Sequence, residues 1–189
     1  QLKYAIDELN KAIAEHGMDL ITFVIGENGL DLAKKYDLPF PIIKVGNWIG
    51  PLLVQAATQK VKKIILLGYY GKLIKLAGGI FHTHNHLADA RIEILVYLAI
   101  KQKIPLKIIN TFMNSQTIDD AIKIVEAFNI EVAKKLIYEI SNRVEIRSKE
   151  YIERYISSDI KVEVILFDRD RKIRAISNSS QKMFSKILT

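Results

Sequence analysis

The sequence predicts an α/β fold, in which a mostly parallel sheet has helices on both faces and an antiparallel C-terminal hairpin at its edge. Strand-length apolar runs alternate with helical patterns, as in parallel sheets covered on both faces. Three of these runs end at a glycine, at Gly26, Gly46 and Gly68. Near the carboxyl end, two apolar segments flank the charged run from Asp168 to Lys172, which is typical of a hairpin.

Apolar periodicity and glycine or proline punctuation give the expected elements of the first half. In order, they are a helix at 1–16 stopped by Gly17, a strand at 20–25, a turn at Gly26–Gly29, a helix at 30–36, a strand at 40–45, a helix at 50–60 that begins near Pro51, a strand at 63–67, a turn at Gly68–Gly71, and a short helix around Leu73 that stops at Gly78–Gly79. A helical pattern is already running at Gln1, so we expect the chain to begin in the middle of a longer protein.

The second half predicts more helix than strand. The expected elements are a long helix at 87–100, a short fourth strand at 106–109, helices near 117–127 and 129–156, and the hairpin strands at 160–167 and 173–177. The helix at 87–100 is apolar around so much of its girth that we expect it to be buried. Because no repeat or low-complexity linker interrupts the chain, we expect one α/β domain over 1–189.

Composition limits the chemistry. The chain has 189 residues, of which 49% are hydrophobic, so it can bury a sizeable core. The absence of cysteine excludes disulfides, thiolate metal sites and cysteine nucleophiles, and it favours a reducing, cytoplasmic location. No apolar run approaches the roughly 18 residues of a membrane helix, and no leader pattern opens the chain, so we expect no membrane association.

The charge is unevenly distributed. The formal net charge is +7, and no Asp or Glu occurs between Asp37 and Asp89. That gap contains most of the expected glycine turns and the following cations: Lys44, Lys60, Lys62, Lys63, Lys72, Lys75 and three of the four histidines. Ammonium groups and exposed backbone N–H groups both favour anions, so the region suits an anionic ligand. The alternative is a set of scattered, solvated surface lysines.

The glycine turns share a position as well as a pattern. Gly26–Gly29, Gly46–Gly50 and Gly68–Gly71 each follow a strand, and the carboxyl ends of parallel strands share the rim where ligands bind. None matches a dinucleotide or nucleotide phosphate loop, which argues against those ligands. Each turn taken alone could simply reverse the chain. We also expect Asn47 to cap the next helix and Trp48 to be core rather than a wall for a ring-shaped ligand.

The segment from His82 to His86 holds three histidines. In an extended conformation His82, His84 and His86 would share one face and could bind a metal, although the absence of carboxylates before Asp89 disfavours a dication. We favour instead hydrogen bonds to a substrate carboxylate, or proton transfer. Lys72 and Lys75 lie three apart on one helical face, which more often indicates a solvated edge than a ligand clamp. Asp89 suits the start of the next helix, whereas Arg91 there often faces an anion.

Several of these segments together resemble one enzyme family. They are Gly46–Asn47–Trp48–Ile49–Gly50, Leu67–Gly68–Tyr69–Tyr70–Gly71–Lys72–Leu73–Ile74–Lys75–Leu76–Ala77–Gly78–Gly79, Phe81–His82–Thr83–His84 and Ala88–Asp89–Ala90–Arg91. In this order they resemble the cobalt-precorrin-5B C(1)-methyltransferase family, called CbiD. Ile25–Gly26–Glu27–Asn28–Gly29 departs from that family's Pro-Gly-Asn-x-Gly turn, and the family's amino-terminal half is missing.

The resemblance implies methylation of C-1 of cobalt-precorrin-5B by S-adenosylmethionine, giving cobalt-precorrin-6A in anaerobic cobalamin biosynthesis. It assigns the cofactor to Gly26, Asn28, Gly29, Gly46, Asn47 and Gly68, substrate carboxylates to Lys72, Lys75 and Arg91, and the reacting side to His82, Thr83, His84 and Asp89. Cobalt would arrive with the anionic tetrapyrrole, so no metal held by the protein is expected. The expected partners are this substrate and the missing amino-terminal half, and a homo-oligomer of the chain stays open.

Two other functions stay open at this point. The chain could be a non-catalytic domain that binds a tetrapyrrole or assembles with a partner half. It could also be a basic nucleic-acid-binding module, whose lysines would contact phosphates. The lysines are not interleaved with exposed aromatic residues and no nucleic-acid-binding motif occurs, so we expect no nucleic-acid partner.

Overall fold

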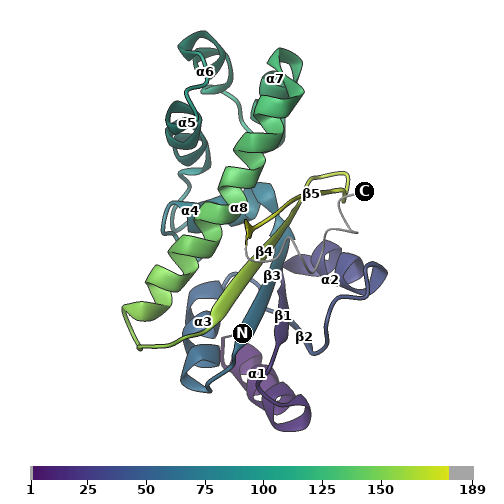
Figure 1. Cartoon of the computed structure of the whole chain (residues 1–189). Helices are drawn as coiled ribbons and strands as arrows, with labels where there is room; N and C mark the ends of the chain where they lie inside the picture. Colours follow the sequence, from purple (N-terminus) through teal and green to yellow (C-terminus); the bar gives the residue numbers. More distant parts are fainter. Residues whose placement is uncertain (1, 179–189) are drawn as a thin grey trace.

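The computed structural model describes residues 2–178, which form a five-stranded sheet with the order β2-β1-β3-β4-β5 (Figure 1). The strands are β1 (Ile21–Val24), β2 (Ile42–Lys44), β3 (Lys63–Tyr69), β4 (Lys161–Phe167) and β5 (Ile173–Ile176). The first four are parallel, and β5 runs antiparallel to β4 at the edge. The predicted fold class, including the edge hairpin, is therefore confirmed.

Helices cover both faces of the sheet unequally. They are α1 (Leu2–His16), α2 (Gly26–Lys35), α3 (Ile49–Thr58), α4 (Tyr70–Ala77), α5 (Arg91–Lys101), α6 (Leu106–Phe112), α7 (Ile118–Phe128) and α8 (Ile130–Glu153). Leu32 and Ala33 of α2 belong to a small core on one face. A larger core on the other face contains residues of α1, α3, α4 and α8.

The central strand β3 shows why its sequence is apolar throughout. Ile64 and Leu66 belong to the larger core, whereas Ile65 and Leu67 belong to the smaller one. Successive side chains of a strand point to opposite faces, so a strand covered on both sides needs apolar residues at every position. The continuous apolar run is therefore a consequence of the two-sided packing.

Helices α5, α6 and α7 lie together beyond one end of the sheet, next to α4 and α8 (Figure 1). Side chains fix the starts of the last two helices. Thr117 accepts a hydrogen bond from the backbone N–H of Asp120 (3.1 Å), and Asn129 accepts one from that of Glu131 (2.9 Å). The expected helices near 117–127 and 129–156 are confirmed within a few residues, because these side chains satisfy free N–H groups at the helix starts.

Two predictions for the middle of the chain were wrong. The strand expected at 106–109 is helix α6, which begins after Pro105 and buries Ile109 and Phe112 on one face. The helix expected at 87–100 begins only at Arg91, and its full burial was also wrong, because Tyr97 and Ile100 are 55% and 57% exposed. Local apolar content did not reveal which side of each segment faces the core.

The expected turns at Gly26–Gly29 and Gly68–Gly71 were also wrong. Gly26 is the first residue of α2, and its positive φ of 71° lets the chain pass directly from strand to helix. Gly68 lies inside β3 and Gly71 lies in the first turn of α4. No helix in residues 2–178 has the length and apolar character needed to cross a bilayer.

Candidate functional site

Two adjoining pockets open where the sheet changes winding direction. Helices α2 and α4 follow the neighbouring strands β1 and β3 but pack on opposite faces, which marks the point where such sheets bind ligands. The α2 pocket, of about 390 Å³, is lined by Ile25, Gly26, Glu27, Asn28, Tyr69, Lys72, Phe167, Asp168 and Arg169. The histidine-loop pocket, of about 400 Å³, is lined by Asn47, Tyr69, Gly71, Lys72, Lys75, Thr83, His84, Asn85, His86 and Arg91. Tyr69 and Lys72 belong to both.

A larger hollow of about 670 Å³ lies at the opposite end of the strands, between the loops that lead into β3 and β4. Its lining includes Lys60, Lys62 and Lys161 but none of the residues to which the family resemblance assigns a role. In open α/β sheets ligands bind beyond the carboxyl ends of the strands, so position favours the two adjoining pockets despite their smaller volume.

The histidine loop, residues 82–90, is organised by a buried lysine. Lys75 is 0% exposed. Its Nζ donates hydrogen bonds to the backbone oxygen of Thr83 (3.2 Å), to Oδ1 of Asn85 (2.6 Å) and to the backbone oxygen of Ala88 (2.7 Å). These three bonds hold a non-helical loop between α4 and α5, which explains why α5 begins later than predicted.

A second tether joins this loop to the segment after β2. The Thr83 hydroxyl donates to Oδ1 of Asn47 (3.0 Å), and the Thr83 N–H donates to the Asn47 backbone oxygen (3.2 Å). Asn47 does not cap α3, so that prediction was wrong. Its side chain instead connects two parts of the pocket wall that are distant in sequence.

The three histidine rings follow one another in a row, and the His82 and His84 ring centroids lie 6.5 Å apart. The loop turns at 84–87, where the Leu87 N–H donates to the backbone oxygen of His84 (3.1 Å). His82 packs edge-on against Trp48, with ring centroids 4.4 Å apart, whereas the exposed His84 and His86 rings stack at 5.0 Å. Trp48 packs against the larger core, as expected. Within residues 2–178 no group of three His, Cys, Asp or Glu side chains could hold a metal ion.

The histidine-loop pocket is cationic. Its lining contains Lys72, Lys75, Arg91 and two histidines but no carboxylate. Arg91 donates two hydrogen bonds of 2.7 Å to Asp89, and this side-chain hydrogen bonding lowers the pKa of Asp89 below its usual value. Burial, and then the charge of Lys75, lower the pKa of Lys72. Such crowding of positive charge favours an anion in this pocket.

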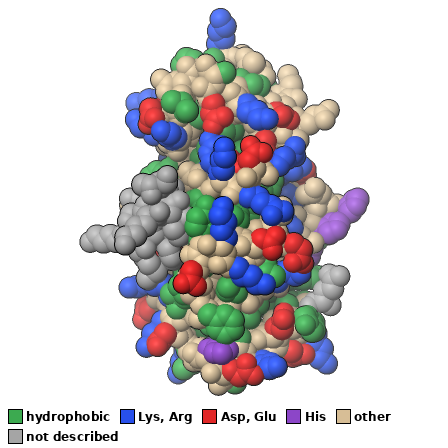
Figure 2. Space-filling view, turned by 90° about the vertical axis from the view of Figure 1, so that its right-hand side faces the viewer, with side chains coloured by type: hydrophobic (Ala, Val, Ile, Leu, Met, Phe, Trp, Pro, Cys, Tyr) green, Lys and Arg blue, Asp and Glu red, His purple; other side chains and the backbone are tan. Residues whose placement is uncertain are grey.

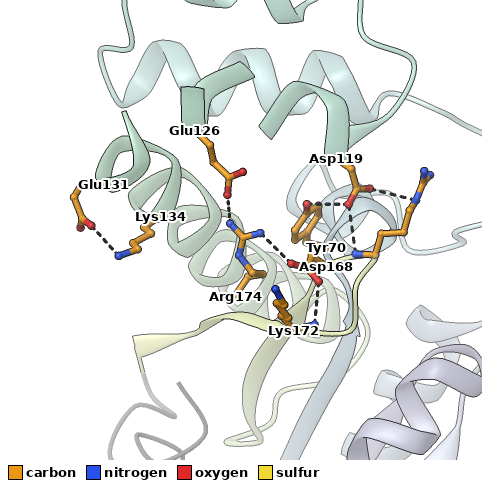
Figure 3. A network of polar contacts seen from close by, with 9 residues as sticks. Tyr70, Asp119, Glu126, Glu131, Lys134, Asp168, Lys172 and Arg174 are labelled. Atoms are coloured by element: carbon orange, nitrogen blue, oxygen red, sulfur yellow. Dashed lines mark hydrogen bonds and ion pairs between the residues drawn. The ribbon is translucent and has the colours of Figure 1, made fainter. Parts of the chain in front are cut away.

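The α2 pocket has a different character. Aromatic rings of Tyr69 and Phe167 lie with centroids 6.4 Å apart, and Glu27, Asn28 and Asp168 add oxygen acceptors. Asp168 is buried and is held by the Lys172 backbone N–H (2.9 Å) and by Arg174 Nη1 (3.0 Å). Figure 3 shows the Arg174 side chain lying between Asp168 and Glu126, with which it also pairs.

The structure brings together most, though not all, of the residues expected to carry function. The α2 pocket contains Gly26 and Asn28, and the histidine-loop pocket contains Asn47, Lys72, Lys75, Thr83, His84 and Arg91. Gly29 and Gly68 are buried, while Gly46, His82 and Asp89 line neither pocket. Asp89 contacts the histidine-loop pocket only through Arg91. The two residues also line a further hollow beside α5.

The sequence did not predict four residues that line the α2 pocket, namely Tyr69, Phe167, Asp168 and Arg169. Tyr69 lines both pockets, although the sequence indicated it only as part of the Gly68–Gly71 segment. Phe167, Asp168 and Arg169 follow β4, and the charged run that predicted the hairpin contained the signal. A fourth parallel strand ending in charged residues belongs at the same rim as the other three.

Comparison with known proteins identifies the family of the chain. The family model described as "CbiD, C-terminal domain" matches residues 82–178, which include the histidine loop and the β4–β5 hairpin. The chain belongs to the CbiD family. A curated CbiD relative from Prochlorococcus marinus subsp. pastoris, named cobalt-precorrin-5B C(1)-methyltransferase, is 58% identical over 98% of this chain and 50% of its own length.

Further CbiD relatives carry the same name. One from Prochlorococcus marinus strain MIT 9515 is 58% identical over 92% of this chain and 47% of its own length. Another, from Prochlorococcus marinus strain MIT 9312, is 51% identical over 98% of this chain and 50% of its own length. The chain thus spans about half the length of the curated relatives it matches. No solved structure matches the chain.

Proposed function

We propose that the chain is the carboxyl-terminal half of a cytoplasmic enzyme that methylates C-1 of cobalt-precorrin-5B, giving cobalt-precorrin-6A in anaerobic cobalamin biosynthesis. One observation carries the proposal: two pockets of different polarity adjoin at the point where the sheet changes winding direction, and they share Tyr69 and Lys72. A methyl transfer needs two ligands in contact, and the adjoining pockets offer a place for each. The names of the CbiD relatives support the reaction.

The α2 pocket fits S-adenosylmethionine, which supplies the methyl group from a sulfonium centre. Tyr69 offers aromatic surface for a purine ring, while the exposed Glu27 and Asn28 offer acceptors for ribose hydroxyls and an ammonium group. Gly26 lies at the start of α2, where a small residue leaves backbone N–H groups open to a carboxylate. This chain therefore contributes Gly26 and Asn28 to the cofactor side, as the resemblance implies.

The histidine-loop pocket fits the carboxylated edge of a tetrapyrrole. Lys72, Arg91, His84 and His86 can all donate to acetate and propionate groups. The three bonds of Lys75 go to its own loop, so we assign Lys75 the task of holding that loop in place. Cobalt belongs to the substrate on this proposal.

The chemistry asked of this chain is mostly positioning. The ring carbon of the substrate is the nucleophile, so the protein must align the two ligands and exclude water. Thr83 and His84 line the reacting side from the histidine loop, and Asp89 orients Arg91 through their two bonds. A nucleic-acid role receives less support, because the face in Figure 2 intersperses Lys and Arg with Asp and Glu side chains.

Calorimetric titration with S-adenosylhomocysteine tests the cofactor site. We expect saturable binding, both by the 189-residue chain and by a full-length protein in which the amino-terminal half of a relative precedes it. A single-turnover assay of the full-length protein with cobalt-precorrin-5B then separates an enzyme from a non-catalytic binding domain. Failure of the full-length protein to bind S-adenosylhomocysteine would contradict the proposal, as would tetrapyrrole binding without methyl transfer.

A further inference from the structure

A buried carboxylate lies beside the two pockets without belonging to either. Asp119, in the first turn of α7, is 6% exposed. It accepts hydrogen bonds from the hydroxyl of Tyr69, the hydroxyl of Tyr70 (3.0 Å) and the backbone N–H of Arg169 (3.4 Å). Figure 3 shows Tyr70 and Asp119 facing one another. Asp119 thus joins the start of α4, the start of α7 and the β4–β5 turn at the rim of the site.

The two tyrosines differ in what else they touch. Tyr70 is 2% exposed and lines neither pocket, whereas Tyr69 is half-buried and lines both. The two rings stack, with centroids 5.3 Å apart. Tyr69 is therefore the member of the pair that can contact a ligand, and the buried Tyr70 ring packs against it.

Gly71 makes room for the Tyr69 ring. A Cβ atom at position 71 would lie 2.5 Å from two ring atoms of Tyr69 and 2.6 Å from its hydroxyl oxygen. Real Cβ atoms do not approach so closely, so any larger residue would displace the ring. Glycine at this position thus keeps the Tyr69 hydroxyl beside Asp119 and does not form the turn that the sequence predicted.

The bond to Asp119 decides what the Tyr69 hydroxyl can offer. A phenol has one proton to donate, and here that proton is directed to a carboxylate oxygen. Its oxygen can then only accept. The lining of the neighbouring histidine-loop pocket includes donors, namely Lys72, Arg91, His84 and His86. An acceptor oxygen at the boundary between the pockets suits a positively charged group and disfavours a carboxylate.

We propose that the Tyr69 hydroxyl oxygen contacts the positively charged sulfonium side of S-adenosylmethionine at the boundary between the two pockets, and that Asp119 is the positioning residue that holds it as an acceptor. This inference rests on the proposed function, because it takes the α2 pocket as the cofactor site. It adds a recognition element for the charge that distinguishes S-adenosylmethionine from its product, S-adenosylhomocysteine. The contact favours the ligand that still carries the methyl group.

The variant Tyr69→Phe keeps the ring and removes the hydroxyl. We measure its affinity for S-adenosylmethionine and for S-adenosylhomocysteine by calorimetry, in the full-length protein described above. S-adenosylmethionine should bind on the order of tenfold more weakly, because a contact to a charged group is lost. S-adenosylhomocysteine lacks the charge and should change by less than about twofold. The ratio of the affinity for S-adenosylmethionine to that for S-adenosylhomocysteine should therefore fall in Tyr69→Phe. Asp119→Asn should lower the same affinity ratio, because an asparagine side chain offers one acceptor oxygen to two hydroxyl donors.

Tyr70→Phe is the matched control. It removes the other hydroxyl bonded to Asp119 but leaves both pockets intact, so it should lower the unfolding temperature and leave the affinity ratio unchanged. An unchanged ratio in Tyr69→Phe, or an equal change in Tyr70→Phe, would overturn the inference while leaving the proposed function standing. If the unmodified full-length protein bound neither ligand, the proposed function itself would fail.

Discussion

Two lysines one turn apart on α4 occupy opposite environments. Lys75 is fully buried and donates three hydrogen bonds to the histidine loop, whereas Lys72 is half-buried and forms no ion pair within residues 2–178. Their sequence spacing predicted a shared face and a shared exposure. The difference arises because the loop folds over Lys75, a long-range event that helical spacing does not encode.

Lys75→Met should destabilise the protein by about 2 to 4 kcal/mol, because it fills the same volume but leaves three buried or half-buried oxygens without their donor. Urea denaturation measures the loss, and hydrogen exchange should show faster exchange in residues 82–90. Lys72→Met is the control on the same helix and should change stability by less than about 0.5 kcal/mol. Equal effects of the two substitutions would argue against Lys75 as the loop anchor.

Lys72 should make anion binding sensitive to alkaline pH. Burial and the neighbouring Lys75 lower the pKa of Lys72 below its usual 10.5, so this side chain loses its proton earlier as the pH rises. Affinity for a carboxylated porphyrin such as uroporphyrin should therefore fall as the pH rises toward 10.5, beginning below the pH at which an ordinary lysine loses its proton. Lys72→Arg should flatten that fall, since a guanidinium stays charged over this range. A decline of the same size in both proteins would exclude Lys72 as its source.

Residue chemistry explains what the sequence could reveal of the site. Of the lysines in the stretch without acids, only Lys72 and Lys75 line the histidine-loop pocket, whereas Lys44, Lys62 and Lys63 form ion pairs elsewhere. The expected residues Asn47, Thr83, His84 and Arg91 do meet in this pocket. Asp119 could not be anticipated, because it lies 50 residues from Tyr69 in sequence and looks like an ordinary helix-start acid. Only the packing of α7 against the start of α4 makes it a partner of two tyrosines.

At the scale of elements, some glycines are required because neighbouring elements pack closely against them, and not because the chain turns there. Gly50, the second residue of α3, donates its N–H to the Phe81 backbone oxygen (3.1 Å). A Cβ atom there would lie 2.8 Å from both the Phe81 Cβ and the Tyr151 hydroxyl. Because Phe81 leads directly into the histidine loop, α3 and α8 together set the position at which that loop begins.

Gly50→Ala should cost about 1 to 3 kcal/mol of stability, since Phe81 and Tyr151 must both move. Gly29→Ala on α2 is the matched control, because its nearest neighbour would be the Val24 Cβ at 3.4 Å, an ordinary contact. Alanine is preferred over glycine within a helix by about 1 kcal/mol, so this variant should be neutral or more stable. Guanidinium denaturation midpoints decide the order, and a stable Gly50→Ala protein would contradict the packing argument.

Strands and long helices were predictable where one pattern had one explanation. Continuous apolar runs identified β1 and β3, and the helices expected near 117–127 and 129–156 correspond to α7 and α8. The segment from Leu106 to Ile109 was ambiguous, because four residues with three apolar side chains fit a strand or a helical turn equally well. Burial of Ile109 and Phe112 resolves it as a helix, and that burial depends on α7.

At the scale of the whole molecule, the sheet combines strands from inside and outside the region that matches the family model. Seven register pairs join β3 to β4, from Lys63 with Lys161 to Tyr69 with Phe167, although the matched region begins at residue 82. Residues 82–178 alone would therefore lack the three strands β1, β2 and β3. This arrangement is consistent with a single domain over 1–189. The single domain itself stays a prediction.

We expect one cooperative unfolding transition. Trp48, the only tryptophan, precedes the matched region, whereas α5 to α8 within it supply much of the helical circular dichroism signal. Tryptophan fluorescence and far-ultraviolet circular dichroism should give the same midpoint in urea, because coincident transitions are a sign of two-state behaviour. Separate midpoints would show that α5 to α8 fold as an independent unit.

The pairing of β3 with β4 also bears on synthesis of the chain. Strands β1, β2 and β3 leave the ribosome well before β4, with helices α4 to α8 translated in between. During that interval β3 has an open edge of apolar residues, the kind of surface that pairs with other nascent chains. Chaperone dependence should therefore be greatest while α8 is being made and should end once residue 167 has emerged.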